Sequence, residues 1–575
     1  MKMNLKTLRE LPMSVFVVLL GLISLVGCSG ATDINDYLLN DVSAPYDPSK
    51  QVTVSDFVPK SGGVGQQLVI KGTNFGNDTS IVKVLIGGRE APLVNVKGEN
   101  LYCFVPSGAY SGEIEVKVGA GTTEQTATAS EKFLYERKMV VGTLCGYKNS
   151  QDNQGWKPGP FETCAGFRND GVMQFSPYNK DQLFIVYDKE PNWEGQHAIQ
   201  LLDLKERTVK DVLPTSLFTG IISSANLRLR TIDFAKDPFY YLENGTRVGR
   251  LADQDPLTQA AFKTNLLQNR WSEHLVVSVD YQNSTYTAPT VYIVDRDITG
   301  EFSANSSSKL LCSYNQCNGA TLHPVNGELY FSSYTQGQML RCDMSAYWQT
   351  VQDGTAWDPA ANTSDYINVI FPIQDVGFEC QIDIHPSGNY AYIVVINKSY
   401  MLKTDYNWTT QTFAAPYQIA GQLNQRGTDD GVGKSAKLTR PYQGAFAVNP
   451  AYQQAGKEDI YDFYFCDSES NLIRYLSPEG IVSTYAGSNG KNYADGNSFG
   501  NENGELRDVA RFNRPTGFVT KLTYDVLDAQ GLPTRIFYIL DTKNCQIRTI
   551  GYENETTPAS TGTTASKGTT GVTGN

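Results

Sequence analysis

Tryptophan is the residue type in this chain best suited to hold a ligand without catalysis. All six tryptophans follow residue 137, and several stand in polar, turn-rich sequence such as NQGWKPG, EPNWEGQ and DYNWTT. An indole exposed in a loop can stack on the apolar face of a sugar ring while nearby Asn, Gln and Asp side chains bind the hydroxyl groups. We predict one or two such platforms for a polysaccharide or oligosaccharide; for any single tryptophan, packing inside the fold is the alternative. The candidates are Trp156, Trp193, Trp271, Trp348, Trp357 and Trp408.

Other patterns with catalytic potential are incomplete. Residues 427–435 nearly match a phosphate-binding loop, but five residues rather than four separate Gly427 from Gly433, and Asp429 and Asp430 would repel phosphate. The chain has only 4 histidines and contains neither H-E-x-x-H nor G-x-S-x-G. We therefore predict no catalytic residue, no metal site and no cofactor. With 60 Asp and Glu residues, a polysaccharide lyase or hydrolase could exist without a signature, and that alternative stays open.

The first 28 residues have the pattern of an exported, lipid-anchored protein. Basic residues precede the apolar run MSVFVVLLGLISLV, which is short for a membrane span and has the build of a signal-peptide core. The run leads into LVGC, which resembles the bacterial lipobox, where the Cys thiol receives a diacylglyceryl group. The resemblance implies removal of residues 1–27, lipidation of Cys28 and attachment to a membrane. The polar, turn-prone residues 28–50 are predicted to form a tether.

The remaining cysteines carry a weaker signal. Apart from Cys28, nine of the 10 cysteines remain, an odd number for an oxidising export route. Most lie in or beside predicted strands, where buried free thiols are expected. Cys312 and Cys317, in CSYNQC, are close enough in sequence to close a small disulfide loop, and this pairing stays open.

Composition favours strands over helices and argues against one class of partner. The chain has 51 Gly, 33 Tyr and 25 Phe but only 8 Met, which is typical of all-β proteins with many turns. Its 575 residues exceed one ordinary domain. A formal net charge of -12 argues against binding to nucleic acid.

Residues 51–137 indicate a small antiparallel sandwich. Short runs such as QQLVIKG, IVKVLIGG and GEIEVKVG alternate with turn residues at the spacing of such folds. In the segment GTNFG, Gly72 and Gly76 would permit positive φ while Phe75 turns inward. These landmarks resemble the IPT/TIG family of immunoglobulin-like domains. That family supplies spacers, dimerisation surfaces and binding units, and we expect a spacer here.

Residues 138–552 contain an internal repeat. The segment FYFCDSESNLIRYL is echoed by FYILDTKNCQIRTI, which places Asp467 and Asp541, and likewise Arg474 and Arg548, 74 residues apart. Each copy is preceded by a segment with Ala-Gly, Asp-Gly, Ala and Arg-Pro in the same order. A third copy of part of this segment, GPFETCAGFRNDGVMQF, begins at residue 159.

The repeat resembles the NHL repeat of β-propellers. The resemblance implies a propeller of about six blades over residues 138–552, with strands from both ends of that region completing one blade. The predicted fold class is therefore all-β, an Ig-like sandwich followed by a propeller. Residues 553–575, rich in Thr, Ser and Gly, are predicted to be a disordered tail.

An anchor, an Ig-like module and a propeller together resemble the surface glycan-binding lipoproteins of starch-utilisation-like (Sus-like) systems. The resemblance implies an outer-membrane lipoprotein facing the exterior, which binds polysaccharide non-catalytically and works beside an outer-membrane transport complex. The IPT/TIG domain would be the spacer. Two alternatives stay open: a protein-interaction scaffold at the cell envelope, and a propeller polysaccharide lyase or hydrolase.

Overall fold

The computed structural model separates the chain into two compact units. The N-terminal unit comprises Met1–Lys138, and the second comprises Met139–Val526 and Pro533–Glu553. The described residues are 44–63, 66–106, 109, 111–136, 138–146, 155–177, 179–188, 197–218, 227–237, 240–243, 246–250, 256, 270–271, 273–281, 290–297, 301–313, 317–333, 336–358, 366–373, 379–488, 497–527 and 533–552. Cys28, the predicted signal segment and the predicted tail lie outside these residues.

The N-terminal unit is a sandwich of two four-stranded sheets. One sheet has the order β1 (Thr53–Val58), β3 (Gln67–Thr73), β7 (Asn100–Phe104), β6 (Leu93–Lys97), and the other the order β5 (Arg89–Glu90), β4 (Val82–Ile86), β8 (Ile114–Val118), β9 (Gln125–Thr128). A short parallel pair joins β2 (Ser61–Gly62) to β10 (Leu134–Tyr135). Alternate residues of β8 are buried, as expected for a strand with one face on the core. The predicted Ig-like sandwich is confirmed.

In the GTNFG turn, the role of Gly72 differs from the prediction. Gly76 has φ +81° and Asn74 has φ 62°, but Gly72 is an ordinary strand residue of β3. Gly72 is required by close packing instead, because a Cβ there would lie 1.9 Å from the carbonyl oxygen of Thr53 and 2.3 Å from the ring of Phe75. Phe75 is fully buried, as predicted.

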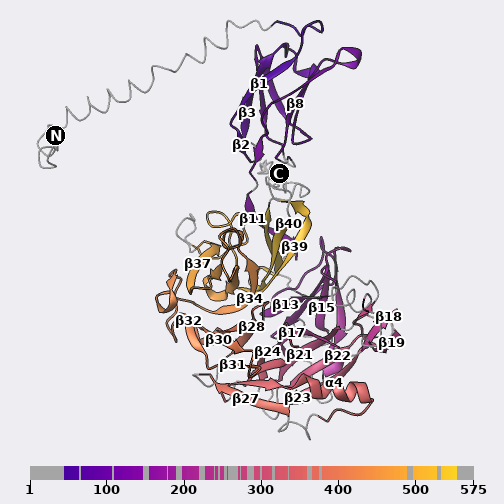
Figure 1. The fold of residues 1–575 in the computed structure, drawn as a ribbon, viewed down its shortest axis with the longest axis vertical. Coiled ribbons are helices and arrows are strands. Elements are labelled where there is room, and N and C mark those ends of the chain that lie inside the picture. Colours follow the sequence, from indigo (N-terminus) through magenta and orange to yellow (C-terminus); the bar gives the residue numbers. More distant parts are fainter. Residues whose placement is uncertain are drawn as a thin grey trace, which may run out of the picture. The chain divides into compact units, whose positions relative to one another are not determined.

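The second unit is a β-propeller, with six four-stranded blades in the part that the structure describes. Blades 1 to 3 are β13 (Gly171–Phe175), β14 (Gln182–Tyr187), β15 (His197–Asp203), β16 (Thr208–Pro214); β17 (Leu227–Lys236), β21 (Glu273–Tyr281), β22 (Thr290–Asp295), β23 (Ser307–Ser313); and β24 (Cys317–Leu322), β25 (Leu329–Ser333), β26 (Gln338–Cys342), β27 (Ile367–Pro372). The first strand of each blade is innermost, and these strands gather at the centre of the unit (Figure 1).

Blades 4 to 6 follow the same plan. They are β28 (Cys380–Ile384), β29 (Tyr390–Val395), β30 (Tyr400–Asn407), β32 (Tyr417–Gly421); β34 (Pro441–Val448), β35 (Tyr461–Asp467), β36 (Leu472–Leu476), β37 (Ile481–Ala486); and β39 (Pro515–Leu527), β40 (Pro533–Asp541), β41 (Gln546–Tyr552), β11 (Met139–Cys145). Strand β11 pairs with β41 in antiparallel register from Met139↔Tyr552 onward. The two ends of the propeller region therefore complete one blade, as predicted, and β11 covers the outer edge of β41.

Shorter elements decorate the blades. Blade 4 carries β31 (Thr412–Phe413), and a separate sheet joins β18 (Tyr240–Glu243), β19 (Thr246–Arg250) and β20 (Arg270–Trp271). The α-helices in the described ranges are α4 (Met344–Asp353), which lies between β26 and β27, and α6 (Pro450–Gln454). No helix in the described ranges is both long and apolar enough to cross a membrane.

The repeat corresponds to blades 1, 5 and 6. In each, a two-residue strand extends the outer edge: β12 (Gly159–Pro160), β33 (Gly431–Val432) and β38 (Gly504–Glu505). An alanine follows each short strand, and a large apolar residue stands two positions after that alanine. The buried pairs are Ala165 and Phe167, Ala436 and Leu438, and Ala510 and Phe512. These residues tie the segment before each blade to its core.

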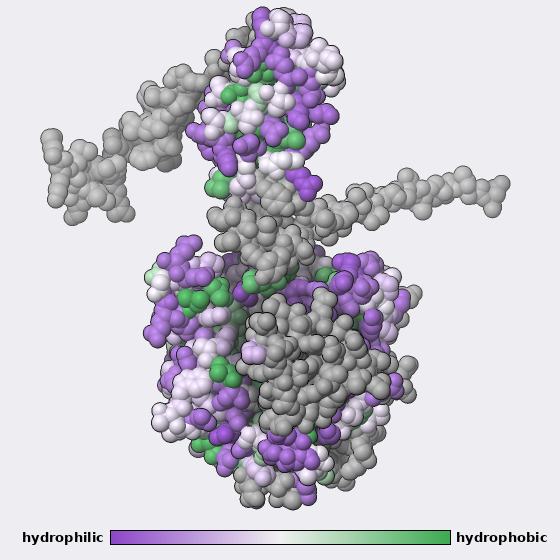
Figure 2. Space-filling view, turned by 45° about the vertical axis from the view of Figure 1, so that its right-hand side comes forward, coloured by the Kyte–Doolittle hydropathy of each residue, from purple (hydrophilic) through white to green (hydrophobic). Residues whose placement is uncertain are grey.

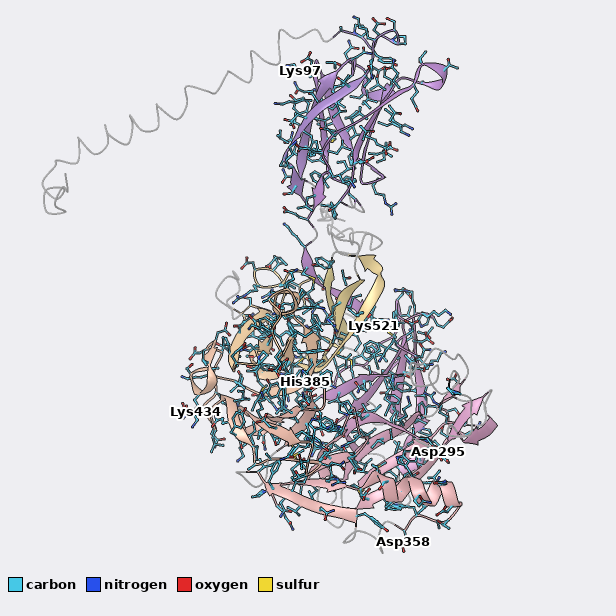
Figure 3. The ribbon with its side chains drawn as sticks, in the orientation of Figure 1. Lys97, Asp295, Asp358, His385, Lys434 and Lys521 are labelled. Atoms are coloured by element: carbon cyan, nitrogen blue, oxygen red, sulfur yellow. The ribbon has the colours of Figure 1, made fainter. Side chains whose placement is uncertain are left out.

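The repeated Asp and Arg hold the same segment in place. Arg474 and Asp467 are both fully buried and lie 3.3 Å apart. The Arg474 guanidinium also donates to the carbonyl oxygen of Asp429 and to Oδ1 of Asp430, both at 2.9 Å. Residues 427–435 therefore form the segment that precedes blade 5 and is fixed to it by Arg474. This structural role agrees with the conclusion from the sequence that they are not a phosphate-binding loop. Lys434 from this segment lies at the outer edge of the propeller (Figure 3).

Candidate ligand-binding site

The six inner strands surround a cavity on the propeller axis. Its volume is about 480 Å³, and every inner strand contributes to its wall. One lining residue from each strand, in blade order, is Gln174, Asp233, Thr321, Asp383, Gln443 and Val519. An adjoining cavity of about 730 Å³ shares part of this wall and extends to the turn after β24, where the inner strands end. Both volumes are in the range of about 300–1,000 Å³ usual for small-molecule sites.

The opposite end of the inner strands is occupied by a network of ion pairs. Its members are Asp170, Asp188, Arg228, Arg230, Glu379, Arg440 and Arg514. Arg440 of blade 5 lies 3.0 Å from Asp170 of blade 1 and 3.2 Å from Glu379 of blade 4, so the network crosses the axis. Burial would raise the pKa of Asp188, but Arg230 and Arg228 hold that pKa well below its usual range. The axial cavity therefore opens away from this network.

Asp233 joins three blades at the cavity floor. Its carboxylate accepts hydrogen bonds from the backbone N–H of Leu322 at 2.8 Å and from Oγ1 of Thr321 at 3.0 Å, both in blade 3. It also accepts from Nε2 of Gln174 in blade 1 at 3.4 Å and from the backbone N–H of Phe234. Burial outweighs these bonds and raises the pKa of Asp233.

Asp383 is the second carboxyl group of the floor. It lies in β28 and lines both cavities. Its Oδ2 is buried and has no hydrogen-bond partner among the described residues. Burial, followed by the negative charge of Asp233, raises the pKa of Asp383 to about 8. The floor of the cavity is thus acidic and holds one unsatisfied carboxyl group.

Two histidines shape the turns at the open end. His323 Nδ1 accepts from the backbone N–H of Val325 and of Asn326, and His385 Nδ1 accepts from that of Ser387. Both rings therefore close the turn that follows an inner strand. Burial lowers the pKa of both imidazoles. Figure 3 shows His385 toward the middle of the propeller.

Trp408 stands next to the His323 turn. Its ring centroid lies 5.6 Å from that of His323 and 4.9 Å from that of Tyr406. The indole N–H donates to Oδ1 of Asn389 at 2.8 Å, and 46% of the residue is exposed. The His323 turn lines the larger cavity, so Trp408, which does not itself line that cavity, is an oriented and accessible ring against one of its walls.

The other predicted tryptophans have different surroundings. Trp156 is half-buried, and its indole donates to Oδ2 of Asp211 at 3.1 Å. Trp348, in α4, is only 6% exposed. Trp357 donates to the carbonyl oxygen of Leu311 on β23, the outer strand of blade 2. The whole of Trp193 and the side chain of Trp271 lie outside the described residues.

A third cavity, of about 580 Å³, lies between α4 and β23. Trp357 and Tyr347 line it, and their ring centroids are 5.6 Å apart. Because both rings pack against each other and Trp357 is bonded to β23, these side chains fix α4 over the outer strand. This cavity has no counterpart to the acidic floor of the axial site.

Next to α4, His274 is held between two carboxylates. Its Nδ1 lies 2.7 Å from Asp295, and its Nε2 lies 3.7 Å from Asp237. Burial would lower the pKa of His274, but these two partners raise it to about 9. The imidazole ring also contacts Trp348. This charged group secures α4 against blade 2.

No group of three or more His, Cys, Asp or Glu side chains suited to a metal ion occurs in the described ranges. The described thiols are buried and free, as expected, namely Cys103, Cys145, Cys164, Cys312, Cys342, Cys380, Cys466 and Cys545. The side chain of Cys317, the candidate partner of Cys312, lies outside the described residues.

The two floor carboxyl groups were missed by sequence reasoning. Each is an Asp between apolar residues of an inner strand, in TIDF for Asp233 and QIDI for Asp383. A carboxylate beside core residues is costly to bury, and this pattern was the one indication in the sequence.

Comparison with known proteins gives matches to the first unit and to most of the chain. Residues 53–135 match the IPT/TIG domain family, which confirms that prediction. A solved structure from Bacteroides thetaiotaomicron, of a protein proposed to be a phosphatase, has 42% identity and a TM-score of 0.63, covering 89% of this chain and 99% of its own. Among curated proteins, none matches.

Two further solved structures are described as auxiliary nutrient binding proteins. The one from Bacteroides thetaiotaomicron has 34% identity and a TM-score of 0.57, and the one from Bacteroides ovatus has 30% identity and a TM-score of 0.64. Each match covers 89% of this chain and 100% of the other. The likeness therefore extends over both units.

Proposed function

The chain belongs to the same family as these Bacteroides proteins, and on this premise we propose that it binds a polysaccharide or oligosaccharide non-catalytically at the open end of its propeller. The observation that carries the proposal is the axial cavity with Trp408 beside its mouth. The nutrient-binding description of two full-length relatives supports it.

The chemistry of the site fits a carbohydrate. An exposed indole offers a flat apolar surface for a sugar ring, and Asn389 holds that indole in one orientation. The cavity adds polar groups that bond hydroxyl groups, among them Gln174 and Thr321. The carboxyl groups of Asp233 and Asp383 disfavour phosphate at the floor, while Lys180 and Lys236 line other parts of the same wall.

The other parts of the chain complete the proposal. The lipobox resemblance supports a lipid anchor at Cys28, and the IPT/TIG domain would serve as a spacer between that anchor and the propeller. On this scheme the protein lies in the outer membrane, faces the exterior and passes its ligand to an outer-membrane transport complex. The side of the N-terminal unit seen in Figure 2 is mainly hydrophilic, which suits a spacer in water.

Affinity gel electrophoresis of the full-length chain in detergent, on a panel of polysaccharides, tests the proposal. We expect retardation on at least one polysaccharide without release of oligosaccharides. Trp408→Ala should weaken binding about 2- to 12-fold, since aromatic stacking contributes about 0.5–1.5 kcal/mol. Phe499→Ala is the matched control, because this ring is similarly exposed, at 48%, and is not part of the site.

The outcomes separate the candidate functions. Retardation with released product would identify a lyase or hydrolase. Equal retardation of the Trp408→Ala and Phe499→Ala variants would show that Trp408 does not contribute to ligand binding. No retardation on any polysaccharide would refute glycan binding and favour the scaffold alternative.

A further inference from the structure

We propose that the axial site is selective for an amino sugar, whose protonated amine binds Asp383. This inference rests on the proposed function, because it names the chemical class of carbohydrate that the same cavity takes. It is carried by an unsatisfied carboxyl group, by the charge around that group and by the walls of the cavity.

Asp383 lacks the partner that a buried carboxyl group needs. Its Oδ2 is hidden from water and meets no hydrogen-bond donor in the part of the chain that the structure describes. Leaving such a group unpaired costs about 1–3 kcal/mol or more. Asp383 as a whole is only partly buried and lines the cavity, so a ligand there can donate to the other oxygen of the same carboxyl group.

The negative charge of Asp233 also favours a cationic ligand at Asp383. Its two oxygens already accept four hydrogen bonds from protein groups, which fills the capacity of a carboxylate. It can therefore offer negative charge but no further acceptor. Lys236 lines both cavities and Lys180 lines the smaller one, but neither offsets the charge that Asp233 exerts on Asp383. An incoming ammonium group would do so, and would leave Asp383 ionised.

The apolar residues of the cavity wall indicate that the amino group belongs to a sugar ring. Phe234, Phe446 and Pro386 line the larger cavity beside the carboxyl groups. Apolar surfaces of this kind accept the C–H face of a sugar, while an ammonium group presents three donors to the floor. A divalent cation is a poorer occupant, because it requires about six or more oxygen ligands and the floor offers two carboxyl groups, one already saturated. The carboxyl groups of the floor disfavour the carboxylate of a uronic acid or a sulfate group at that position.

Isothermal titration calorimetry with the full-length chain tests this inference. The probes are an oligomer of β-1,4-linked glucosamine, its N-acetylated counterpart, an oligogalacturonate and spermidine. N-acetylation removes the positive charge while keeping the ring. We expect the glucosamine oligomer to bind about tenfold or more tightly than the N-acetylated one, since a charge-assisted bond to a buried carboxylate is lost. The oligogalacturonate should bind weakest.

The Asp383→Asn variant should abolish the preference for the amine and keep the binding of the N-acetylated oligomer. Asp508→Asn, which alters an exposed carboxylate outside the site, is the control and should change neither affinity. The preference of the unaltered protein is itself a test, and it does not depend on how well a variant folds.

Each contrary result has a distinct meaning. Equal affinity for the amine and N-acetylated oligomers would overturn the inference but leave carbohydrate binding in place. Spermidine binding as tightly as the glucosamine oligomer would overturn the assignment to a sugar. A preference that survives in Asp383→Asn would refute the role of this residue, and failure of every oligosaccharide to bind would refute the proposed function together with the inference.

Discussion

Replacing Arg474 by methionine is expected to destabilise the propeller by about 3–5 kcal/mol, which is the usual cost of removing one partner from a buried ion pair. Methionine keeps much of the apolar stem, so the change isolates the guanidinium. Asp467 is completely buried, and burial already raises its pKa against the effect of Arg474, so removal of the guanidinium leaves a carboxyl group that is costly to keep ionised. The carbonyl oxygen of Asp429 would lose one of two donors and keep the backbone N–H of Lys437.

The corresponding shift in melting temperature follows from the size of the unit. For roughly 400 residues, an unfolding entropy of about 2.1 cal/mol/K per residue gives about 0.8 kcal/mol/K. A loss of 3–5 kcal/mol then lowers Tm by about 4–6 °C. Differential scanning calorimetry is the suitable assay, because it can separate the transitions of the two units.

Arg207→Met is the matched control for this measurement. Arg207 pairs with Glu162 at 2.9 Å, but both side chains are more than half exposed. Exposed pairs contribute about 0–1 kcal/mol, so Tm should fall by about 1 °C or less. Equal shifts for the two variants would refute the argument that burial makes the repeated Asp–Arg pair important.

Three further predictions concern other parts of the chain. The Tm of the propeller should fall between about pH 6.5 and 9, because His274, with its pKa raised to about 9, keeps a proton that the unfolded chain has lost; the contribution is full below pH 6.5 and absent above 9, and His274→Gln should flatten a plot of Tm against pH. Gly72→Ala should unfold the N-terminal unit at a lower temperature, by several degrees in calorimetry, while the propeller transition stays constant, since the added Cβ has no space. Cys28→Ala should move the protein from the membrane pellet to the supernatant after fractionation, and retention in the pellet would contradict lipid anchoring at this residue.

The blade architecture could be predicted because it is encoded locally and more than once. Asp467 and Arg474 recur at Asp541 and Arg548 with the same spacing, and each pair does the same work in its own blade. The strands of one blade, with their turns and core residues, are contiguous in sequence. Hydrophobic periodicity and sequence duplication are therefore enough to identify them. The turn at Phe75 was predicted for similar reasons, although the role of Gly72 depended on a contact with a different strand.

The axial site could not be predicted in the same way. Asp233 and Asp383 are 150 residues apart in sequence, and they line the same cavity only because the blades are arranged in a ring. Residue type also could not separate the tryptophans. Trp348 and Trp408 both stand among polar residues in sequence, yet one is buried under its neighbours and the other is open to solvent.

Because β11 and β41 close the ring, the propeller can be completed only after its last strand has been synthesised. Strand β11 leaves the ribosome first, and its main partner β41 is made roughly 400 residues later. Until then the face of blade 1 that shares a core with blade 6, with Phe175 and Leu183 against Tyr538 and Leu540, has no cover. Exposed apolar surface of this kind promotes aggregation, so a chain that stops before blade 6 differs from a finished molecule in the surface that it presents.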